Sequence, residues 1–245
     1  MGLTEAIIIK TQKYKEDSKI VQLLTEEGVV ASLGRGCLKV KSKNFYLLHE
    51  ITKIEFDLQT RNNSFGILKS TKLIDNYSTI KTEPYKIEST LEIFEIVNIF
   101  AEHITDYKIF YNFLSDILDK IKSSDRPDLY KLIFKIKMLY LLGVAPEFTS
   151  CVNCGDKTNL IGFDFESGGM KCNRCCSFEK FLKNNIFIEF KKLYLTKLHN
   201  ITDEIEINNL DECDNFINSY YAKYLGYNIK TANVFKKINN NSSRS

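Results

Sequence analysis

The chain has 245 residues, 44% of them hydrophobic and 27% charged, which is enough for a sizeable core and two or three small domains. It contains no apolar run of about 18 residues and no signal peptide at its start, so we expect neither a transmembrane helix nor secretion. Seven cysteines, four of them with the spacing of a metal site, fit a reducing cytoplasm, which is the predicted location.

The formal net charge of +3 at pH 7 is unevenly distributed along the chain. Residues 1–80 contain 12 Lys and Arg against 9 Asp and Glu, whereas the remaining residues contain 22 of each kind. Within this first third, one stretch without any acidic residue contains Arg35, Lys39, Lys41 and Lys43. Such a run is a modest electrostatic footprint for a polyanion, although a solvated basic loop has the same pattern.

Residues 1–80 are predicted to form short strands, at 6–9, 20–24, 29–33, 53–58 and 65–68. The second and third are joined by a hairpin turn in which Gly28 can adopt positive φ. The fourth alternates apolar and charged side chains, the period of two that marks a half-buried strand. Five short strands in about 70 residues indicate a small closed barrel, and the OB-fold is the commonest such barrel that binds oligonucleotides.

Beyond about residue 84 the apolar residues recur at helical spacing. We expect helices around 87–101, 110–121, 129–140, 186–198 and 210–226. For the third helix, Asp125 is the predicted N-cap and Pro127 lies in the first turn, while Gly143 and Pro146 end it. These apolar stripes indicate a helical core rather than binding grooves.

The most specific pattern is a pair of CxxC motifs, Cys151 with Cys154 and Cys172 with Cys175. The 17 residues between them fall within the spacing of known zinc sites. Four thiolates provide the tetrahedral sulfur set that Zn²⁺ prefers, and they leave no open position for water or substrate. Gly155 and the pair Gly168-Gly169 supply the tight backbone that such knuckles need. We therefore predict a structural zinc site rather than a catalytic one.

Two alternatives to this metal site stay open at the level of sequence. The four cysteines could form two disulfides, or one CxxC could be a redox motif, although no thioredoxin-like pattern surrounds either pair. Cys176 follows Cys175 directly and could replace it, although the CxxC spacing favours Cys175. The sequence has no HExxH motif, no phosphate-binding GxxxxGK[ST] loop and no catalytic dyad, so we do not expect an enzyme.

Together these patterns predict an α+β chain. An N-terminal five-stranded OB-fold β-barrel spans residues 1–80, and an all-helical domain spans residues 81–238. A four-cysteine zinc knuckle at residues 148–181 is inserted into the helical domain, and residues 239–245 form a disordered polar tail. Because charges balance within the zinc module, we do not expect it to be the main nucleic-acid contact.

Several segments match a known family in order and spacing: TEAIIIK (4–10), EDSKI (16–20), LTEEG (24–28), GRG (34–36), CVNCG (151–155), GG (168–169), CNRC (172–175), YY (220–221) and LG (225–226). On these segments the chain resembles RecO, a family of bacterial recombination mediators, and the likeness covers nearly all of its length.

The resemblance implies an OB-fold domain, a helical domain and a zinc site. It further implies a nucleoid-associated protein that binds single- and double-stranded DNA and anneals complementary strands. The implied partners are RecR and the single-stranded DNA-binding protein, with which such a protein helps to load RecA in recombinational repair. It implies no nucleotide hydrolysis, no small-molecule substrate and no membrane partner.

OB barrels bind single strands by combining a positive groove with aromatic stacking platforms. We therefore predict that Arg35, Lys39, Lys41 and Lys43 contact DNA phosphates. Phe45, Tyr46 and Phe65 are candidate platforms, although aromatic residues more often belong to the core. An alternative function that fits the same barrel and zinc site is that of a zinc-ribbon transcription or RNA-binding factor.

Overall fold

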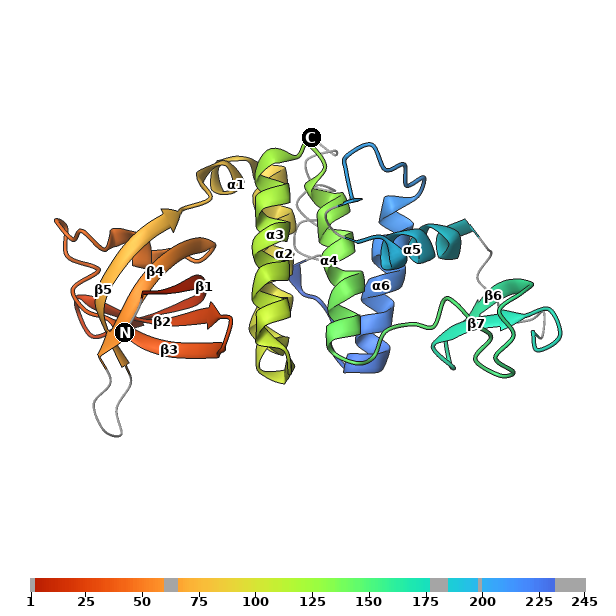
Figure 1. The fold of residues 1–245 in the computed structure, drawn as a ribbon. Coiled ribbons are helices and arrows are strands. Elements are labelled where there is room, and N and C mark those ends of the chain that lie inside the picture. Colours follow the sequence, from red (N-terminus) through yellow and green to blue (C-terminus); the bar gives the residue numbers. More distant parts are fainter. Residues whose placement is uncertain (1–2, 60–65, 177–184, 198–199, 232–245) are drawn as a thin grey trace. The chain divides into compact units, whose positions relative to one another are not determined.

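The computed structural model describes residues 3–59, 66–176, 185–197 and 200–231 (Figure 1). The chain divides into two compact units, Met1–Ser123 (unit 1) and Ser124–Ser245 (unit 2). Four predictions lie outside the described residues: the role of Phe65, the end of the zinc module beyond residue 176, the end of the helical domain beyond residue 231, and the tail at 239–245. Among the described helices, none is long and apolar enough to span a membrane.

Unit 1 starts with five strands: β1 (Thr4–Tyr14), β2 (Ser18–Thr25), β3 (Gly28–Gly34), β4 (Thr52–Gln59) and β5 (Gly66–Asp75). They close into a barrel in the order β1-β2-β3-β5-β4, with β3 and β5 parallel and the other pairs antiparallel. The predicted five-stranded OB-fold barrel is thus confirmed. Alternate side chains of β1, β2 and β4 point inward and form the barrel core, including Ala6, Ile8, Val21, Leu23, Ile54 and Phe56.

The other elements of unit 1 are η1 (Phe45–Leu48), α1 (Ser78–Thr82), α2 (Pro84–Phe100), η2 (Ala101–His103) and α3 (Tyr107–Ser123). Side chains of α3 bind the barrel directly: the Tyr111 hydroxyl donates to Glu5 at 3.1 Å, and Lys53 donates to Ser115 at 3.3 Å. The two long helices are grouped with the barrel, so unit 1 extends well beyond the strand-rich residues 1–80. The sequence did not reveal α1, because five residues are too few to show a helical period.

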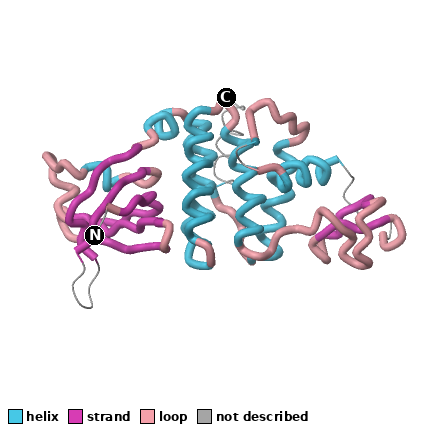
Figure 2. The backbone as a smooth tube through the Cα atoms, in the orientation of Figure 1, coloured by secondary structure: helices cyan, strands magenta, loops and turns pink. Residues whose placement is uncertain are grey.

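Unit 2 consists of α4 (Pro127–Leu141), β6 (Leu160–Asp164), β7 (Gly169–Cys172), α5 (Asn185–Leu195) and α6 (Leu210–Leu225). The β6–β7 hairpin follows α4 and precedes α5 along the chain, and in Figure 2 its strands are magenta and the helices are cyan. Its Phe163 ring stacks on Phe187 of α5 at 4.9 Å and meets Phe216 of α6 edge-on at 5.2 Å. The hairpin therefore shares an aromatic core with two helices and is not a free-standing finger.

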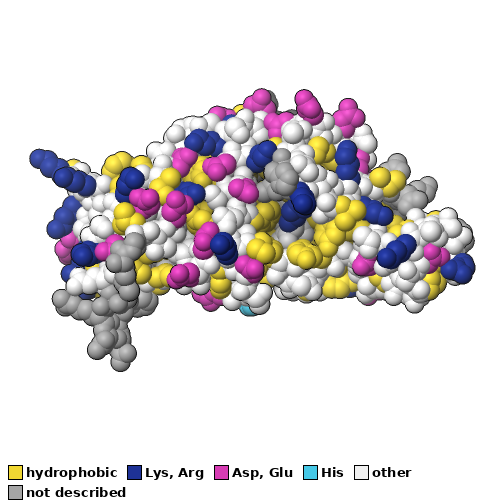
Figure 3. Space-filling model, in the orientation of Figure 1, with side chains coloured by type: hydrophobic (Ala, Val, Ile, Leu, Met, Phe, Trp, Pro, Cys, Tyr) yellow, Lys and Arg dark blue, Asp and Glu magenta, His cyan; other side chains and the backbone are white. Residues whose placement is uncertain are grey.

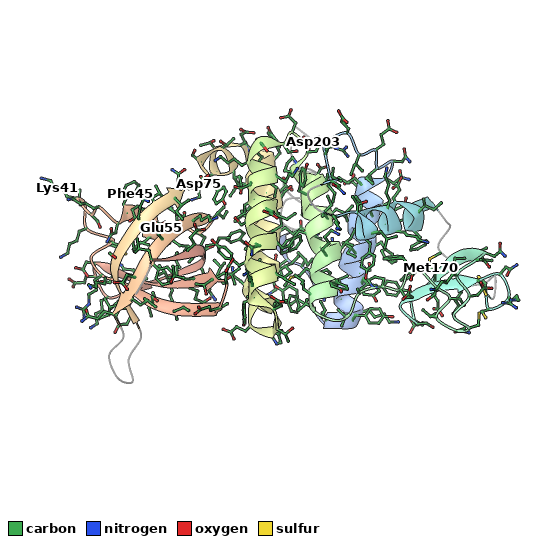
Figure 4. All side chains as sticks on the ribbon, in the orientation of Figure 1. Lys41, Phe45, Glu55, Asp75, Met170 and Asp203 are labelled. Atoms are coloured by element: carbon green, nitrogen blue, oxygen red, sulfur yellow. The ribbon has the colours of Figure 1, made fainter. Side chains whose placement is uncertain are left out.

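The start of α4 corrects one prediction. Asp125 is not the N-cap, because Arg126 occupies that position and its side chain forms no cap hydrogen bond. Instead Ser124 Oγ accepts the N–H of Arg126 at 2.8 Å, and Asp203 Oδ2 accepts from Ser124 Oγ at 2.7 Å. Asp203, labelled in Figure 4, is far away in sequence, so the local cap motif could not show this arrangement.

Candidate metal centre and nucleic-acid interface

The structure brings the sulfur atoms of Cys151, Cys154, Cys172 and Cys175 to within 4.8 Å of one another. The sulfurs of Cys154 and Cys172 are separated by 3.6 Å. Four sulfurs bound to Zn²⁺ at about 2.3 Å in a tetrahedron lie about 3.8 Å apart, whereas a disulfide bond measures about 2.05 Å. All seven cysteines are free thiols. The geometry therefore fits a tetrahedral metal site with four sulfur ligands and does not fit two disulfides.

Short backbone turns shape both knuckles. The N–H of Gly155 donates to the carbonyl of Cys151 at 2.8 Å, and the N–H of Cys175 donates to the carbonyl of Cys172 at 3.1 Å. Between the knuckles, a Cβ atom on Gly169 would lie 2.4 Å from Val152 Cγ1, much closer than packing allows. Glycine is thus required where β7 passes the first knuckle.

The charges of the four thiols are interdependent. Burial disfavours a thiolate at Cys151, but backbone N–H groups of Cys172, Cys154 and Asn153 outweigh it and lower the pKa of Cys151 to about 6. The hydrogen bond with Cys154, together with burial, raises the pKa of Cys175 to about 12. Four thiolates at this spacing repel one another unless a cation binds them. A bound Zn²⁺ would remove this repulsion and hold all four as thiolates.

Cys176 lies outside the cluster of four among the described residues. It is half-buried, and burial raises the pKa of its thiol. A separate contact joins the two knuckles, because Arg174 donates to Asp156 Oδ2 at 2.8 Å. The structure thus places Cys175, which the CxxC spacing favours, beside the other three sulfurs.

The four basic residues proposed for DNA binding lie on the loop between β3 and η1, and all four side chains are exposed. The loop is held from within by Cys37, which is only 1% exposed and belongs to the barrel core. Its backbone is also held, because the N–H of Leu38 donates to the carbonyl of Asp17 at 3.0 Å. Gly36 turns the chain at a φ of 64°, a left-handed conformation that favours glycine, and the side chain of Lys39 lies beside it.

The bond from Leu38 to Asp17 brings a second basic segment to the same place. Asp17 belongs to the β1–β2 turn, and just before it Lys13 and Tyr14 at the end of β1 and Lys15 in the turn are all exposed. The ammonium group of Lys15 lies 5.3 Å from the centre of the Tyr14 ring. In Figure 3, Lys and Arg side chains gather at this left-hand end of the barrel, where Figure 4 labels Lys41. We call residues 13–17 and the 35–43 loop together the basic end.

The sequence did not single out Lys13, Tyr14 and Lys15, because the contact between turn and loop is tertiary. The acidic residues Glu16 and Asp17 also mask their charge when the sequence is read locally. One of these acids lowers the charge of the loop itself, because Asp17 Oδ2 lies 3.4 Å from Lys39 Nζ.

The three candidate stacking residues have different environments. The Phe45 side chain is 59% exposed beside the basic loop, so the expectation that it packs in the core is wrong. The core interpretation is correct for Tyr46, which is 9% exposed and whose hydroxyl donates to the Thr71 carbonyl at 3.0 Å. Only Phe45 is thus available to a base among the described candidates.

Comparisons with known proteins agree with this architecture. A family model described as "Recombination protein O N terminal" matches residues 1–77, and one described as "Recombination protein O C terminal" matches residues 93–232. A protein of Listeria monocytogenes serotype 4b named "DNA repair protein RecO" is 25% identical over 243 residues, covering 97% of this chain and 95% of its own. Proteins of the same name from Exiguobacterium and Bacillus mycoides are 27% identical (95% of this chain, 94% of theirs) and 24% identical (96% of each).

Proposed function

Because the chain belongs to the RecO family of DNA repair proteins, we propose that it is a recombination mediator that binds DNA at the basic end of its barrel. In this proposal it binds single- and double-stranded DNA, anneals complementary strands and, with RecR, helps to load RecA onto strands coated by the single-stranded DNA-binding protein. The observation that carries the proposal is the convergence of two basic segments and an exposed aromatic ring at one end of an OB barrel.

Phosphates would be contacted by Arg35, Lys39, Lys41 and Lys43, with Lys13 and Lys15 extending the surface. Such contacts release counterions and carry no sequence information, so binding would be sequence-tolerant and sensitive to salt. The exposed Phe45 ring would stack on a base, a contact worth about 1–3 kcal/mol. Annealing is compatible with this kind of binding, because contacts to the phosphates leave most bases of both strands free to pair.

The metal centre has a structural role in this proposal. Zn²⁺ held by the four clustered cysteines would fix the two knuckles and the β6–β7 hairpin between them, a segment too small to fold on a core of its own. The hairpin in turn carries Phe163 into the aromatic core of unit 2. Metal binding and the stability of unit 2 are therefore coupled.

A strand-annealing assay tests the proposal directly. Complementary labelled strands coated with the single-stranded DNA-binding protein are mixed with the full chain, and duplex formation is followed by energy transfer between the labels. We expect the full chain to accelerate annealing. The rate should fall in the variant with Arg35, Lys39, Lys41 and Lys43 all replaced by alanine. A zinc-ribbon transcription or RNA-binding factor would not anneal coated strands. If the wild-type chain leaves the annealing rate at the value of the coated strands alone, the proposal is contradicted.

A further inference from the structure

A cavity of about 560 Å³ lies within unit 1, where η1, β4, β5, α1 and the start of α2 meet. Its volume is in the range of small-ligand sites, roughly 300–1,000 Å³. Apolar side chains and groups able to form hydrogen bonds line it together, among them Phe45, His49, Thr52, Leu73, Lys81 and Ile87. Apart from Phe45, none of these side chains takes part in the DNA binding proposed above.

The polar group of most interest in the cavity is Lys81. Its ammonium group is half-buried and donates to Thr52 Oγ1 at 2.9 Å, and within the described residues it forms no ion pair with a carboxylate. Asp75 favours the charged form of Lys81 through space, but its own carboxylate is engaged by other groups. It pairs with Lys122 at 2.6 Å and accepts the Tyr77 N–H at 2.7 Å. A partly desolvated cation without a carboxylate is unfavourable, and an anionic ligand would offset that cost.

The cavity also adjoins the basic end along the chain. Phe45 lines the cavity and lies only two residues after Lys43. In the next residue, the hydroxyl of the buried Tyr46 donates to the Thr71 carbonyl, and this bond anchors the backbone that carries Phe45. Figure 4 labels Lys41 and Phe45 along the same upper edge of the barrel. A strand that crosses the basic loop would therefore reach the cavity without leaving the surface.

One of the residues that line the cavity has a strained backbone. Ile51 has a φ of 56°, a left-handed conformation that a β-branched residue rarely adopts, and its N–H donates to the Ile8 carbonyl at 3.1 Å. The hydrogen bond to β1 therefore keeps the Ile51 backbone in a conformation that isoleucine disfavours. Backbone strain of this kind clusters at ligand sites, which supports a binding role for the cavity but does not identify the ligand.

We propose that the cavity binds one nucleotide of a strand that crosses the basic end, an inference that rests on the proposed function. Phe45 would stack on the base, the apolar wall formed by Leu73 and Ile87 would contact base and sugar, and Lys81 would pair with the phosphate. The continuity of the cavity with the basic loop favours a nucleotide over a peptide that ends in an apolar residue and a carboxylate, which would use the same groups.

The test uses the full chain and the mononucleotide dTMP, followed through the NMR shifts of the Thr52 and Lys81 amides. We expect dTMP to shift both amides and thymidine, which lacks the phosphate, to bind more weakly. Lys81→Gln should weaken dTMP binding about tenfold and leave thymidine binding unchanged, because only the charged contact is lost. Phe45→Leu should weaken both ligands. Lys72→Gln on the exposed outer side of β5 is the matched control and should change neither.

A pH series gives a second readout that a purely structural lysine would not move. Burial lowers the pKa of Lys81 to about 8, with Asp75 partly opposing it. Raising the pH from about 7 to about 9 should therefore weaken dTMP binding to the wild-type chain and leave Lys81→Gln unaffected. Of the other polar groups that line the cavity, His49 does not take up a proton in this range because burial lowers its pKa, and the Glu50 carboxylate accepts the Thr11 N–H at 2.9 Å. A nucleotide phosphate is already ionised above about pH 7.

Two results would overturn the inference. If dTMP leaves the cavity amides unmoved while oligonucleotide binding still depends on Lys41 and Lys43, the cavity is not part of the strand path, although the proposed function stands. If a short peptide with a C-terminal phenylalanine shifts the same amides and dTMP does not, the cavity is a peptide site. Loss of oligonucleotide binding to the wild-type basic end would instead count against the proposed function itself.

Discussion

The ammonium group of Lys39 lies 3.4 Å from the carboxylate of Asp17, so the tip of one hairpin partly neutralises the neighbouring basic loop. Asp17→Asn should release Lys39 while keeping an acceptor for the Ser18 hydroxyl, which now donates to Asp17 at 2.8 Å. We expect affinity for single strands at low salt to rise about two- to fivefold, and the gain to disappear at high salt. Fluorescence anisotropy with a labelled oligonucleotide measures this.

Glu16→Gln is the control for that change, because it removes the same charge from the neighbouring residue, whose side chain is exposed. It should raise the affinity less than Asp17→Asn. Equal gains from the two variants would mean that the affinity depends on the net negative charge of the β1–β2 turn and not on the ion pair between Asp17 and Lys39.

Removal of loop charges should change the salt dependence of binding as well as its strength. Lys41→Ala combined with Lys43→Ala should reduce the slope of log K against log salt by about 1.4, since each phosphate contact on a single strand contributes about 0.7. Adding Arg35→Ala and Lys39→Ala should bring the loss to about 2.8. The measurement is a titration of a labelled oligonucleotide at several salt concentrations.

The matched double variant is Lys69→Ala with Lys72→Ala on β5, whose side chains are 67% and 72% exposed. It removes the same charge from another part of the barrel surface, so the salt slope should stay at the wild-type value. If both double variants reduce the slope equally, the basic end is not the phosphate-binding surface.

Loss of one cluster cysteine should release the metal. Cys154→Ser removes one of the four sulfurs and should reduce bound zinc to well below one equivalent, with a lower melting temperature for unit 2. DNA binding by unit 1 should persist in part. Cys176→Ser leaves the cluster intact and should keep both zinc and stability. Elemental analysis of reduced protein, prepared without chelator, measures the bound zinc. A wild-type chain with less than about half an equivalent of zinc would refute the structural zinc site.

Local patterns identified all five barrel strands, although β1 (Thr4–Tyr14) and β5 (Gly66–Asp75) extend well beyond the predicted 6–9 and 65–68. In β4, Ile54 and Phe56 are buried while Lys53, Glu55 and Asp57 are only partly exposed, as the alternation of apolar and charged residues predicts. The parallel pairing of β3 with β5, which closes the barrel, joins Ser32 with Gly66 and has no local signature. Barrel closure followed only from the number of strands.

The candidate site shows the same limit. The CxxC spacing identified the four clustered cysteines because each pair is a local turn, and only the distance between pairs depends on the fold. The sequence predicted the loop part of the basic end but not Lys13 and Lys15. These two residues join the loop through the tertiary hydrogen bond from Leu38 to Asp17. Exposure of Phe45 beside a buried Tyr46 was likewise a result of packing, which an aromatic pair in sequence cannot reveal.

A buried ion pair in unit 2 gives a final prediction about stability. Lys135 on α4 is fully buried and donates to Asp214 Oδ1 at 2.7 Å and to Asn218 Oδ1 at 2.9 Å, both on α6. Asp214→Ala would leave the ammonium group of Lys135 buried without its closest carboxylate. We expect it to lower the free energy of unfolding by about 3–5 kcal/mol, measured by urea denaturation.

The double variant Lys135→Met with Asp214→Leu separates the energy of the pair from the cost of breaking it. Both replacements are apolar, and Met has a volume close to that of Lys, so the double variant should recover most of the stability that Asp214→Ala loses. Recovery would show that the α4–α6 contact tolerates an apolar core and that the single variant fails because it strands a charge. If the double variant is as unstable as Asp214→Ala, the polar contacts that Lys135 makes with α6 are themselves required for the packing of the two helices.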